Sequence, residues 1–323
     1  MFKIIKPFFL ICETPLHAGS GDNLGIVDLP IQRERHTGFP KIESSSLKGG
    51  IREAFEEKLT EVVDRKRIHA AFGYDDSEKQ EDIKSAFKDN KEYAGALGFT
   101  NARILFFPVK SMKNIFAWIT CPKVLQRFKN DLQLANIDNM PEIPAPNTCP
   151  FGSQLFIKDN KIILEEYAFE ITGKAECENI AKWLSENIFP STKENDPCKY
   201  WEQKIKTDIV VLGDDEFKDF VNLSTEVITR TKINNETGTV QKGALFTEEY
   251  LPAETILYSL AMASPLFAKN KNGFKENGKT EEEKVMKFFV DNLPEVLQLG
   301  GNATIGKGII RTAKMGDSKN DTK

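Results

Sequence analysis

The chain has 323 residues, of which 40% are hydrophobic, a net charge of −4 at pH 7 and five cysteines. This length is enough for one large core or two modest ones, and the slightly acidic balance excludes a uniformly basic nucleic-acid coat, so any affinity for RNA or DNA must come from local stripes. The cysteines are scattered and form no C-x-x-C pair, which favours reduced thiols over a disulfide framework or a zinc site. No window is long and apolar enough for a membrane span and no signal-cleavage pattern is present, so we expect a cytoplasmic protein with no membrane contact.

The first predicted elements are a buried strand, a glycine-rich turn and an amphipathic helix. Residues 2–13 are rich in Phe and Ile and lead into a turn that contains three glycines. A helix is predicted from Ser45 onward by apolar residues at spacings of four, four, four and three, with the run of serines 44–46 as its cap. These apolar residues are Leu47, Ile51, Phe55, Leu59 and Val62. Gly49 and Gly50 are expected in the first turn, where bare amides would favour an anion.

The next segment is charged and the one after it is rich in β-forming residues. Residues 66–92 resemble an insertion or a mobile loop, whereas residues 101–109 and 114–121 predict a hairpin. Residues 122–134 predict a helix that begins at a proline. The order strand, helix, strand, strand, helix then needs one more strand to complete a split βαβ unit of the ferredoxin-like type.

The second half alternates loops with short elements. Four prolines make residues 137–152 a surface loop, and a strand is predicted next. Two helices are predicted after that strand, followed by a projecting hairpin whose turn is near residues 234–238. A strand, a helix, a glycine-rich segment with a short strand and a polar tail that we expect to be disordered complete the chain. In chain order, these predicted elements cover residues 161–172, 176–188, 214–223, 225–250, 254–262, 281–293, 297–312 and 316–323.

Two glycine patterns approach known nucleotide-binding motifs but fail at a decisive position. Gly301, Gly306 and Lys307 match the start of a P-loop, yet Gly308 stands where Ser or Thr would hold magnesium. The turn at residues 19–25 approximates a dinucleotide-binding fingerprint, but a proline and β-branched residues follow it where a helix must begin. Both segments can be plain flexible turns, and we favour glycine loops that let a polynucleotide backbone approach.

Asp28 and two histidines lie within a cation-rich stretch, residues 17–52. An aspartate in a loop is most often a cap or an exposed charge, but beside five cations the carboxylate of Asp28 can also bind Mg²⁺ or accept a proton from a ribose 2′-hydroxyl. His17 and His36 can serve as general acid or base near neutral pH, or contact a base or a phosphate; we favour the binding role.

The residues of six segments resemble the RAMP superfamily of CRISPR proteins, and in particular the backbone subunit of the type III-B effector, the Cmr complex. The segments are LHAGSG at 16–21, LGIVDLPIQRERHTG at 24–38, SLKG at 46–49, residues 103–109 with 116–120, residues 246–249 with 251–252, and the glycine-rich loop that ends at Gly308. The resemblance implies an α+β fold with a ferredoxin-like or RRM-like core, insertions and a projecting β-hairpin thumb. It implies a single RAMP domain over residues 1–315, with insertions at 64–95 and 135–160, the thumb at 225–248 and a tail at 316–323.

The same resemblance implies a function. Several copies would stack along a guide RNA with the other Cmr subunits, and each thumb would wedge between the guide and a complementary target RNA. The target would be cut at regular intervals by attack of a 2′-hydroxyl on the adjacent phosphate, with Asp28 as the catalytic residue and a divalent metal, Mg²⁺ by expectation, as cofactor. The RNA-binding residues would be His17, Ser20, Arg33, Arg35, His36, Ser46, Lys48, Gly49, Arg52, Gly301 and Lys307.

Two other functions remain open at this point. In the first, the chain is a purely structural RNA-binding subunit in which Asp28 only orders its loop. In the second, it is a guide-processing endonuclease that uses His17 or His36 and cuts free precursor RNA.

Overall fold

The computed structural model describes residues 2–21, 25–74, 80–87, 93–158, 160–189, 198–267, 273–274 and 278–315. Its main feature is an eleven-stranded sheet with the order β11-β8-β12-β7-β6-β15-β1-β17-β16, to which β2 and β5 add at β6 and β15. The bounds of these strands are Ile4–Cys12 for β1, Lys41–Ile42 for β2, Leu97–Phe99 for β5, Ala102–Lys110 for β6, Phe116–Thr120 for β7, Thr148–Cys149 for β8, Thr172–Gly173 for β11, Ile209–Val211 for β12, Ile256–Ala263 for β15, Val296–Gln298 for β16 and Ile309–Lys314 for β17.

The centre of the sheet differs from the arrangement that the sequence suggested. β1 pairs antiparallel with both β15 and β17, and β15 pairs antiparallel with β6, so the central order is β17-β1-β15-β6. The strand between β1 and β6 is therefore β15, which comes more than a hundred residues after β6. It is not β7, although β7 forms a hairpin with β6. Local pattern located the hairpin of β6 and β7 correctly, but it carried no information about which strand fills the centre.

Both faces of the central strands are covered by helices. Successive side chains of β1 point to opposite faces, so Phe8 packs on Phe289 with ring centroids 5.6 Å apart, and Phe9 packs on Phe128 at 6.0 Å. Phe289 belongs to α8 (Glu281–Asn292), which lies with α1 (Ser44–Lys58) on one face, and Phe128 belongs to α4 (Pro122–Leu134) on the other. The remaining helices are α2 (Val62–Phe72), α3 (Glu81–Ala86), α5 (Ala175–Ile188), α6 (Cys198–Thr207) and α7 (Asp214–Leu223).

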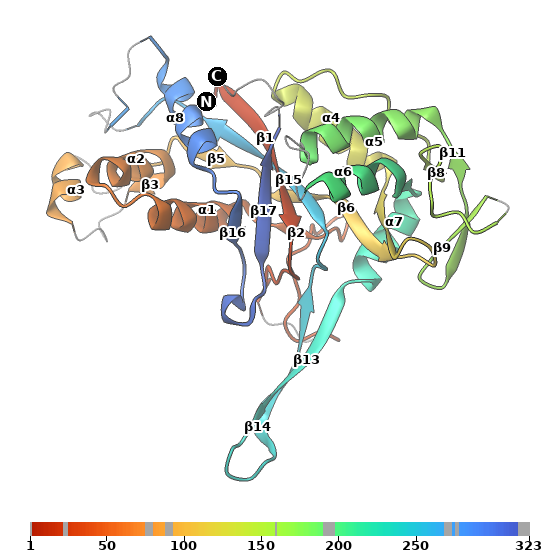
Figure 1. Ribbon diagram of the computed structural model, residues 1–323. Helices are drawn as coiled ribbons and strands as arrows, with labels where there is room; N and C mark the ends of the chain where they lie inside the picture. Colours follow the sequence, from red (N-terminus) through yellow and green to blue (C-terminus); the bar gives the residue numbers. More distant parts are fainter. Residues whose placement is uncertain are drawn as a thin grey trace.

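Three two-stranded sheets accompany the main sheet. The largest joins β13 (Glu226–Ile233) to β14 (Val240–Tyr250), and Figure 1 shows this hairpin extending away from the rest of the molecule. A second joins β9 (Lys161–Leu164) to β10 (Tyr167–Glu170), where one continuous strand was predicted; Glu165 adopts a φ of 51° and turns the chain between them. The third joins β3 (Gly73–Tyr74) to β4 (Tyr93–Ala94).

The start of α1 corrects two expectations. Glu43 holds the N-cap position without a side-chain cap, and Ser44 to Ser46 form the first turn instead of capping it. The amide of Leu47 already donates to the carbonyl of Glu43, so Gly49 and Gly50 lie beyond the first turn and do not present free amides. Gly50 has a packing role, because a Cβ there would lie 2.3 Å from Leu299.

The described part of the segment expected to be a charged insertion is largely helical. α2 and α3 lie within or beside it, and Phe72 of α2 packs on Phe55 of α1 with ring centroids 5.2 Å apart. Arg65 of α2 also faces α1, where it lies 3.7 Å from Glu56, and the run of charged residues in α2 explains why the sequence resembled a loop. Residues 75–79 and 88–92 of this insertion, position 159 of the next one, Leu24 of the motif and the tail at 316–323 lie outside the described residues.

Most other predicted elements are confirmed, with α4 and α7 present at their predicted bounds. α6 and β12 were not predicted. A short 3-10 helix, η1 (Ala303–Ile305), interrupts the glycine-rich segment before β17. Among the described residues, no helix is long and apolar enough to cross a membrane.

Candidate functional site

Strand β14 organises the site because its side chains alternate between two sides. Thr247 and Glu249 face the segment that contains Asp28, and an isolated bridge pairs Leu29 with β14. Glu248 and Tyr250 face the other side, toward the glycine-rich C-terminal loop. The base of the hairpin thus lies between two loops that are far apart in the sequence.

Asp28 is exposed and is held by a single residue of β14. Its Oδ2 accepts hydrogen bonds from the amide of Thr247 at 2.7 Å and from the Thr247 hydroxyl at 2.9 Å. These two bonds lower the pKa of Asp28 below its ordinary value of 3.8, and the bond from the amide has the larger effect. Among the described residues, Oδ1 has no hydrogen-bond partner. The carboxylate is therefore ionised at neutral pH, fixed by one oxygen and open to a ligand through the other.

Glu249 anchors the segment that carries Asp28. Its carboxylate accepts from the amide of Ile31 at 3.0 Å, from Arg33 Nη2 at 2.5 Å and from the Thr225 hydroxyl at 2.8 Å. The other terminal nitrogen of Arg33 donates to the carbonyls of Gly38 and Val221 and to the side chain of Asn222. The guanidinium of Arg33 is thus occupied within the fold and ties this segment to both the hairpin and α7.

Glu248 is the centre of a polar network on the opposite side of β14. It accepts from the Tyr250 hydroxyl at 2.6 Å, from Arg230 at 2.9 Å and from the Asn302 amide at 2.6 Å. Burial alone would raise the pKa of Glu248, but these hydrogen bonds lower it below its ordinary value of 4.5. Burial and the bond to Glu248 raise the pKa of Tyr250 to about 12. The network keeps Glu248 charged and Tyr250 protonated at neutral pH.

His17 lies between the two sides of the site. Its Nδ1 donates to the carbonyl of Glu249 at 2.7 Å, and its Nε2 lies 3.5 Å from Glu248 Oε1. The ring is tilted against that of Tyr250, with centroids 5.6 Å apart. His17 therefore joins the network around Glu248. The sequence predicted His17 as a site residue, but it did not predict these partners.

The C-terminal loop closes against the backbone of His17. Gly301 donates its amide to the carbonyl of His17 at 3.0 Å. Gly300 has a φ of 75°, and a Cβ there would lie 2.3 Å from the same carbonyl, so glycine is required for this contact. Lys307, from the same loop, holds its ammonium 5.0 Å from the centre of the Tyr250 ring.

The other predicted RNA-binding residues divide into two groups. Arg35 and His36 are exposed at the turn after the Asp28 segment, with 71% of the His36 side chain accessible. The hydroxyl of Ser20 donates to the carbonyl of Pro30 at 3.1 Å. Ser46, Lys48, Gly49 and Arg52 lie on α1, and no described contact joins them to Asp28 or Glu248.

The two cations of α1 that were predicted to bind RNA are engaged inside the fold. Lys48 donates to the carbonyl of Leu97 at 2.9 Å, and burial, with the charge of Arg52 nearby, lowers the pKa of Lys48. Arg52 pairs with Glu56 at 2.7 Å and donates to the carbonyl of Gly73 at 3.2 Å. Their contacts tie α1 to neighbouring elements.

Sequence reasoning did not identify Arg230, Glu248, Tyr250 and Asn302 as site residues. Glu248 was part of a segment that supported the family resemblance, but no role followed from it. Arg230 and Asn302 meet at 3.0 Å although 72 positions separate them. The only local signal was a pair of polar residues at alternate positions of a strand.

The residues present limit which metal site is possible. No group of three or more His, Cys, Asp or Glu side chains that could hold a metal occurs among the described residues. Mg²⁺ commonly keeps several waters and binds through one or two carboxylates together with substrate phosphates. The free Oδ1 of Asp28 fits such an ion, whereas a preassembled all-protein cage does not fit.

Comparisons with known proteins identify the family of this chain. The family model described as "RAMPs: RAMP superfamily" matches residues 9–311. The chain belongs to the RAMP superfamily. It is 40% identical over 302 residues to the CRISPR system Cmr endoribonuclease Cmr4 of Pyrococcus furiosus, which covers 92% of this chain and 91% of that protein. It is 25% identical over 335 residues to the CRISPR system CMR subunit Cmr4 of Saccharolobus solfataricus, with 98% of each chain covered.

Solved structures show the same family. The crystal structure of oligomeric Cmr4 from Pyrococcus furiosus has a TM-score of 0.68 and 32% identity, and covers 97% of this chain and 98% of that one. A subunit of the type III-B Cmr-beta complex bound to cognate target RNA has a TM-score of 0.69 and the same coverage at 21% identity, which shows a shared fold. The chain is thus a RAMP protein and a homologue of Cmr4.

Proposed function

We propose that this chain is the guide-RNA-binding backbone subunit of a type III-B CRISPR ribonucleoprotein and that it cuts complementary target RNA at regular intervals, with Asp28 as the catalytic residue. The observation that carries the proposal is the ionised, exposed carboxylate of Asp28 held at the base of a projecting hairpin. The name of the Pyrococcus furiosus relative, an endoribonuclease, supports the reaction class. We place this function in the cytoplasm.

The low pKa of Asp28 bears on its role. A carboxylate whose pKa lies well below neutral pH is a weak proton acceptor, so it contributes less as a general base than as a fixed negative charge. Oδ1 can orient the attacking 2′-hydroxyl of the target ribose or hold a hydrated Mg²⁺. Such an ion would supply neutralisation of the charge that develops on the phosphate.

The hairpin of β13 and β14 gives a physical reason for cutting at intervals. Regular A-form pairing holds the 2′-hydroxyl out of line with the leaving oxygen, and a wedge that displaces one nucleotide frees the backbone to reach in-line geometry. We propose that this hairpin is the thumb that acts as the wedge. Copies of the chain stacked along the guide, together with other Cmr subunits, would then set the spacing of the cuts.

The architecture fits this role. The central order β17-β1-β15-β6, with α1 and α8 on one face, supports a ferredoxin-like core. Because α4 covers the opposite face, we propose that RNA contacts the loops at the base of the hairpin and not the sheet surface used by RRM proteins. Among the described residues, those best placed to contact RNA at these loops are Arg35, His36 and Lys307.

The reconstituted effector tests the proposal. It is incubated with end-labelled complementary RNA, with and without Mg²⁺, and the product lengths are read on a sequencing gel. We expect evenly spaced products that require the metal and carry a 2′,3′-cyclic phosphate and a 5′-hydroxyl. An assembled, guide-loaded particle that leaves the target intact would favour a purely structural subunit, in which the Asp28–Thr247 contact only orders a loop.

A guide-processing nuclease is the remaining alternative. It predicts that the isolated chain cuts free precursor RNA and loses this activity when His17 or His36 is replaced. We expect no such cutting, since His17 already donates to the Glu249 carbonyl.

A further inference from the structure

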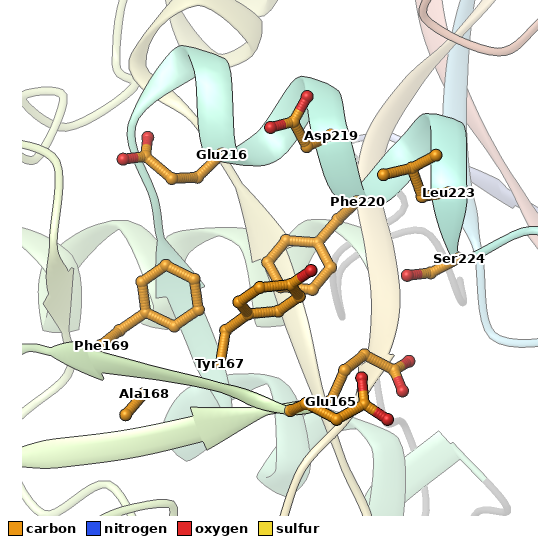
Figure 2. Close-up of a pocket in the computed structure, with 10 residues that line it drawn as sticks. Glu165, Tyr167, Ala168, Phe169, Glu216, Asp219, Phe220, Leu223 and Ser224 are labelled. Atoms are coloured by element: carbon orange, nitrogen blue, oxygen red, sulfur yellow. The ribbon is translucent and has the colours of Figure 1, made fainter.

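An open groove lies between α7 and the hairpin of β9 and β10, outside the Asp28 site. Its volume is about 500 Å³. Figure 2 shows the rings of Tyr167, Phe169 and Phe220 in the groove, with the carboxylates of Glu216 and Asp219 along α7 and that of Glu165 on the opposite rim. Apolar floor and acidic rim thus occur together in one concave surface.

The floor of the groove is formed by aromatic rings in contact with one another. Phe220 is buried and lies edge-on to Tyr167, with ring centroids 6.2 Å apart, and Phe169 lies 5.9 Å from it. The side chains at the mouth are nevertheless open to solvent, since Tyr167 is 61% and Leu223 is 79% exposed. Large exposed apolar side chains gathered on a concave surface mark an interaction site more often than scattered ones do.

The rim of the groove has one sign of charge. Glu165, Glu166, Glu216 and Asp219 line it, and no lysine or arginine does. Within the part of the chain that the structure describes, none of these four carboxylates has a salt bridge or a hydrogen bond through its side chain. A phosphate backbone would be repelled here, whereas lysine or arginine side chains would be attracted.

The position of the groove matters for an RNA-binding protein. α7 ends at Leu223, and β13 of the projecting hairpin begins at Glu226, so the groove adjoins the base of that hairpin. Acidic side chains at this position would keep RNA away from the groove while RNA is bound nearby.

We propose that this groove is a docking surface for another protein, one that presents a segment with lysine or arginine next to large apolar side chains. The apolar side chains would fill the space over Tyr167 and Phe220, and the cations would pair with the four rim carboxylates. The proposal is independent of catalysis by Asp28.

A defined peptide probe tests it on the purified chain. A short fluorescein-labelled amphipathic peptide of Lys and Leu is titrated by fluorescence anisotropy, next to peptides with Ser in place of Leu or Glu in place of Lys. We expect the Lys–Leu peptide to bind and both matched peptides to bind at least about tenfold more weakly, since charge and apolar contact are both needed.

Three variants locate the binding. Glu216→Lys with Asp219→Lys should weaken binding of the Lys–Leu peptide by about tenfold or more, and Leu223→Ser should also weaken this binding. Glu178→Lys with Glu186→Lys, the same change of charge at exposed positions of α5, is the matched control and should not. Circular dichroism melting checks that all variants are folded.

Other outcomes overturn the proposal. Equal peptide binding by the rim variant and the control would show that the groove is not the site. A lower sedimentation coefficient for the rim variant alone would make the groove a contact between copies of this chain. Weaker binding of single-stranded RNA by Leu223→Ser would assign the surface to RNA instead.

Discussion

Thr247 donates two hydrogen bonds to one oxygen of Asp28, from its amide and from its hydroxyl, although 219 positions separate the two residues. The amide bond depends on the backbone and remains in any Thr247 variant. The hydroxyl bond can be removed separately. The pair therefore allows the charge of the Asp28 carboxylate to be tested separately from its position and protonation.

Replacing Asp28 tests its charge. Asp28→Asn keeps an oxygen that can accept from Thr247 but removes the negative charge, and we expect target cutting to fall by about a hundredfold or more. Guide binding should stay within about twofold, because the residue is exposed and lies outside the packed core. Single-turnover cutting by the reconstituted effector and filter binding of the guide measure the two effects. Cutting at the wild-type rate would remove Asp28 from the mechanism.

Thr247 is a positioning residue, and its variant changes a pH profile. Thr247→Val removes the hydroxyl bond, so the pKa of Asp28 should rise toward 3.8. Because the proposed mechanism needs the ionised carboxylate, the acid limb of the pH–rate profile should move to higher pH, with a loss of about tenfold near neutrality from poorer positioning. Thr247→Ser restores the hydroxyl and should restore both. An unchanged acid limb in the valine variant would show that this bond does not control Asp28.

Glu248 should stabilise the fold in a pH-dependent way. Its pKa is lower in the folded than in the unfolded chain, so its contribution is present above the unfolded value near 4.5 and is lost as the pH falls through the folded value. Glu248→Gln leaves Arg230 without its charged partner and should lower the free energy of unfolding at pH 7 by about 2 kcal/mol.

Urea unfolding at pH 7 and near pH 4 measures this effect. The gap between Glu248→Gln and the wild type should narrow at the lower pH, where the wild-type carboxylate begins to gain a proton. Glu236→Gln, at an exposed position of the hairpin turn, is the matched control and should change stability little. A gap of constant size would mean that the charge of Glu248 is not what stabilises the network.

Arg35 and Arg52 should behave differently when each is replaced by alanine. Arg35 is exposed beside the Asp28 segment, so its removal should weaken RNA binding for all sequences and reduce the slope of log K against log salt by about 0.7 for each phosphate that the protein no longer neutralises. Arg52 is bonded to Glu56 and Gly73, so its removal should mainly lower the melting temperature. RNA titrations at several salt concentrations and thermal melts distinguish the two. The opposite pattern would place the RNA on α1.

The exposed part of the hairpin beyond Thr247 should matter for cutting and not for guide binding. Leu245 is 64% exposed and lies on the same side of β14 as Thr247, two residues before it. Leu245→Asp should reduce target cutting by about tenfold or more, because an aspartate repels phosphates and cannot pack between bases.

Two further variants make this test specific. Leu245→Met keeps an apolar side chain and should cut normally, and Gln241→Asp adds the same charge at another exposed position of β14. If Gln241→Asp loses as much activity as Leu245→Asp, then charge on the hairpin, and not the apolar contact, is responsible.

The spacing of apolar residues predicted those elements that bury one regular stripe of side chains. α4 and α7 were predicted at their bounds because each buries one stripe of side chains at helical spacing. α2 was missed because it carries Asp64, Arg65, Lys66 and Arg67 in succession, which hides its apolar face. The place of β15 between β1 and β6 was not predictable locally, since strand order depends on contacts between distant segments.

The same limit applies to the site. Asp28 was found because its neighbours in the sequence form a motif, and its partner Thr247 was not. Glu248 depends on Arg230 and Asn302, which the fold brings together from the hairpin and the C-terminal loop. A residue whose partners are adjacent in sequence leaves a readable signal, and one whose partners arrive through pairing of distant strands does not.

The hydrogen bonds of Glu249 connect the projecting hairpin to the segment that carries Asp28. The carboxylate of Glu249 holds Ile31, Arg33 and Thr225 together and so joins the hairpin base to the Asp28 segment. Under the proposed function, a duplex that pressed on the far end of the hairpin would move the Asp28 carboxylate with it. The fit of the target against the hairpin would then reach the proposed cutting group without a separate sensor.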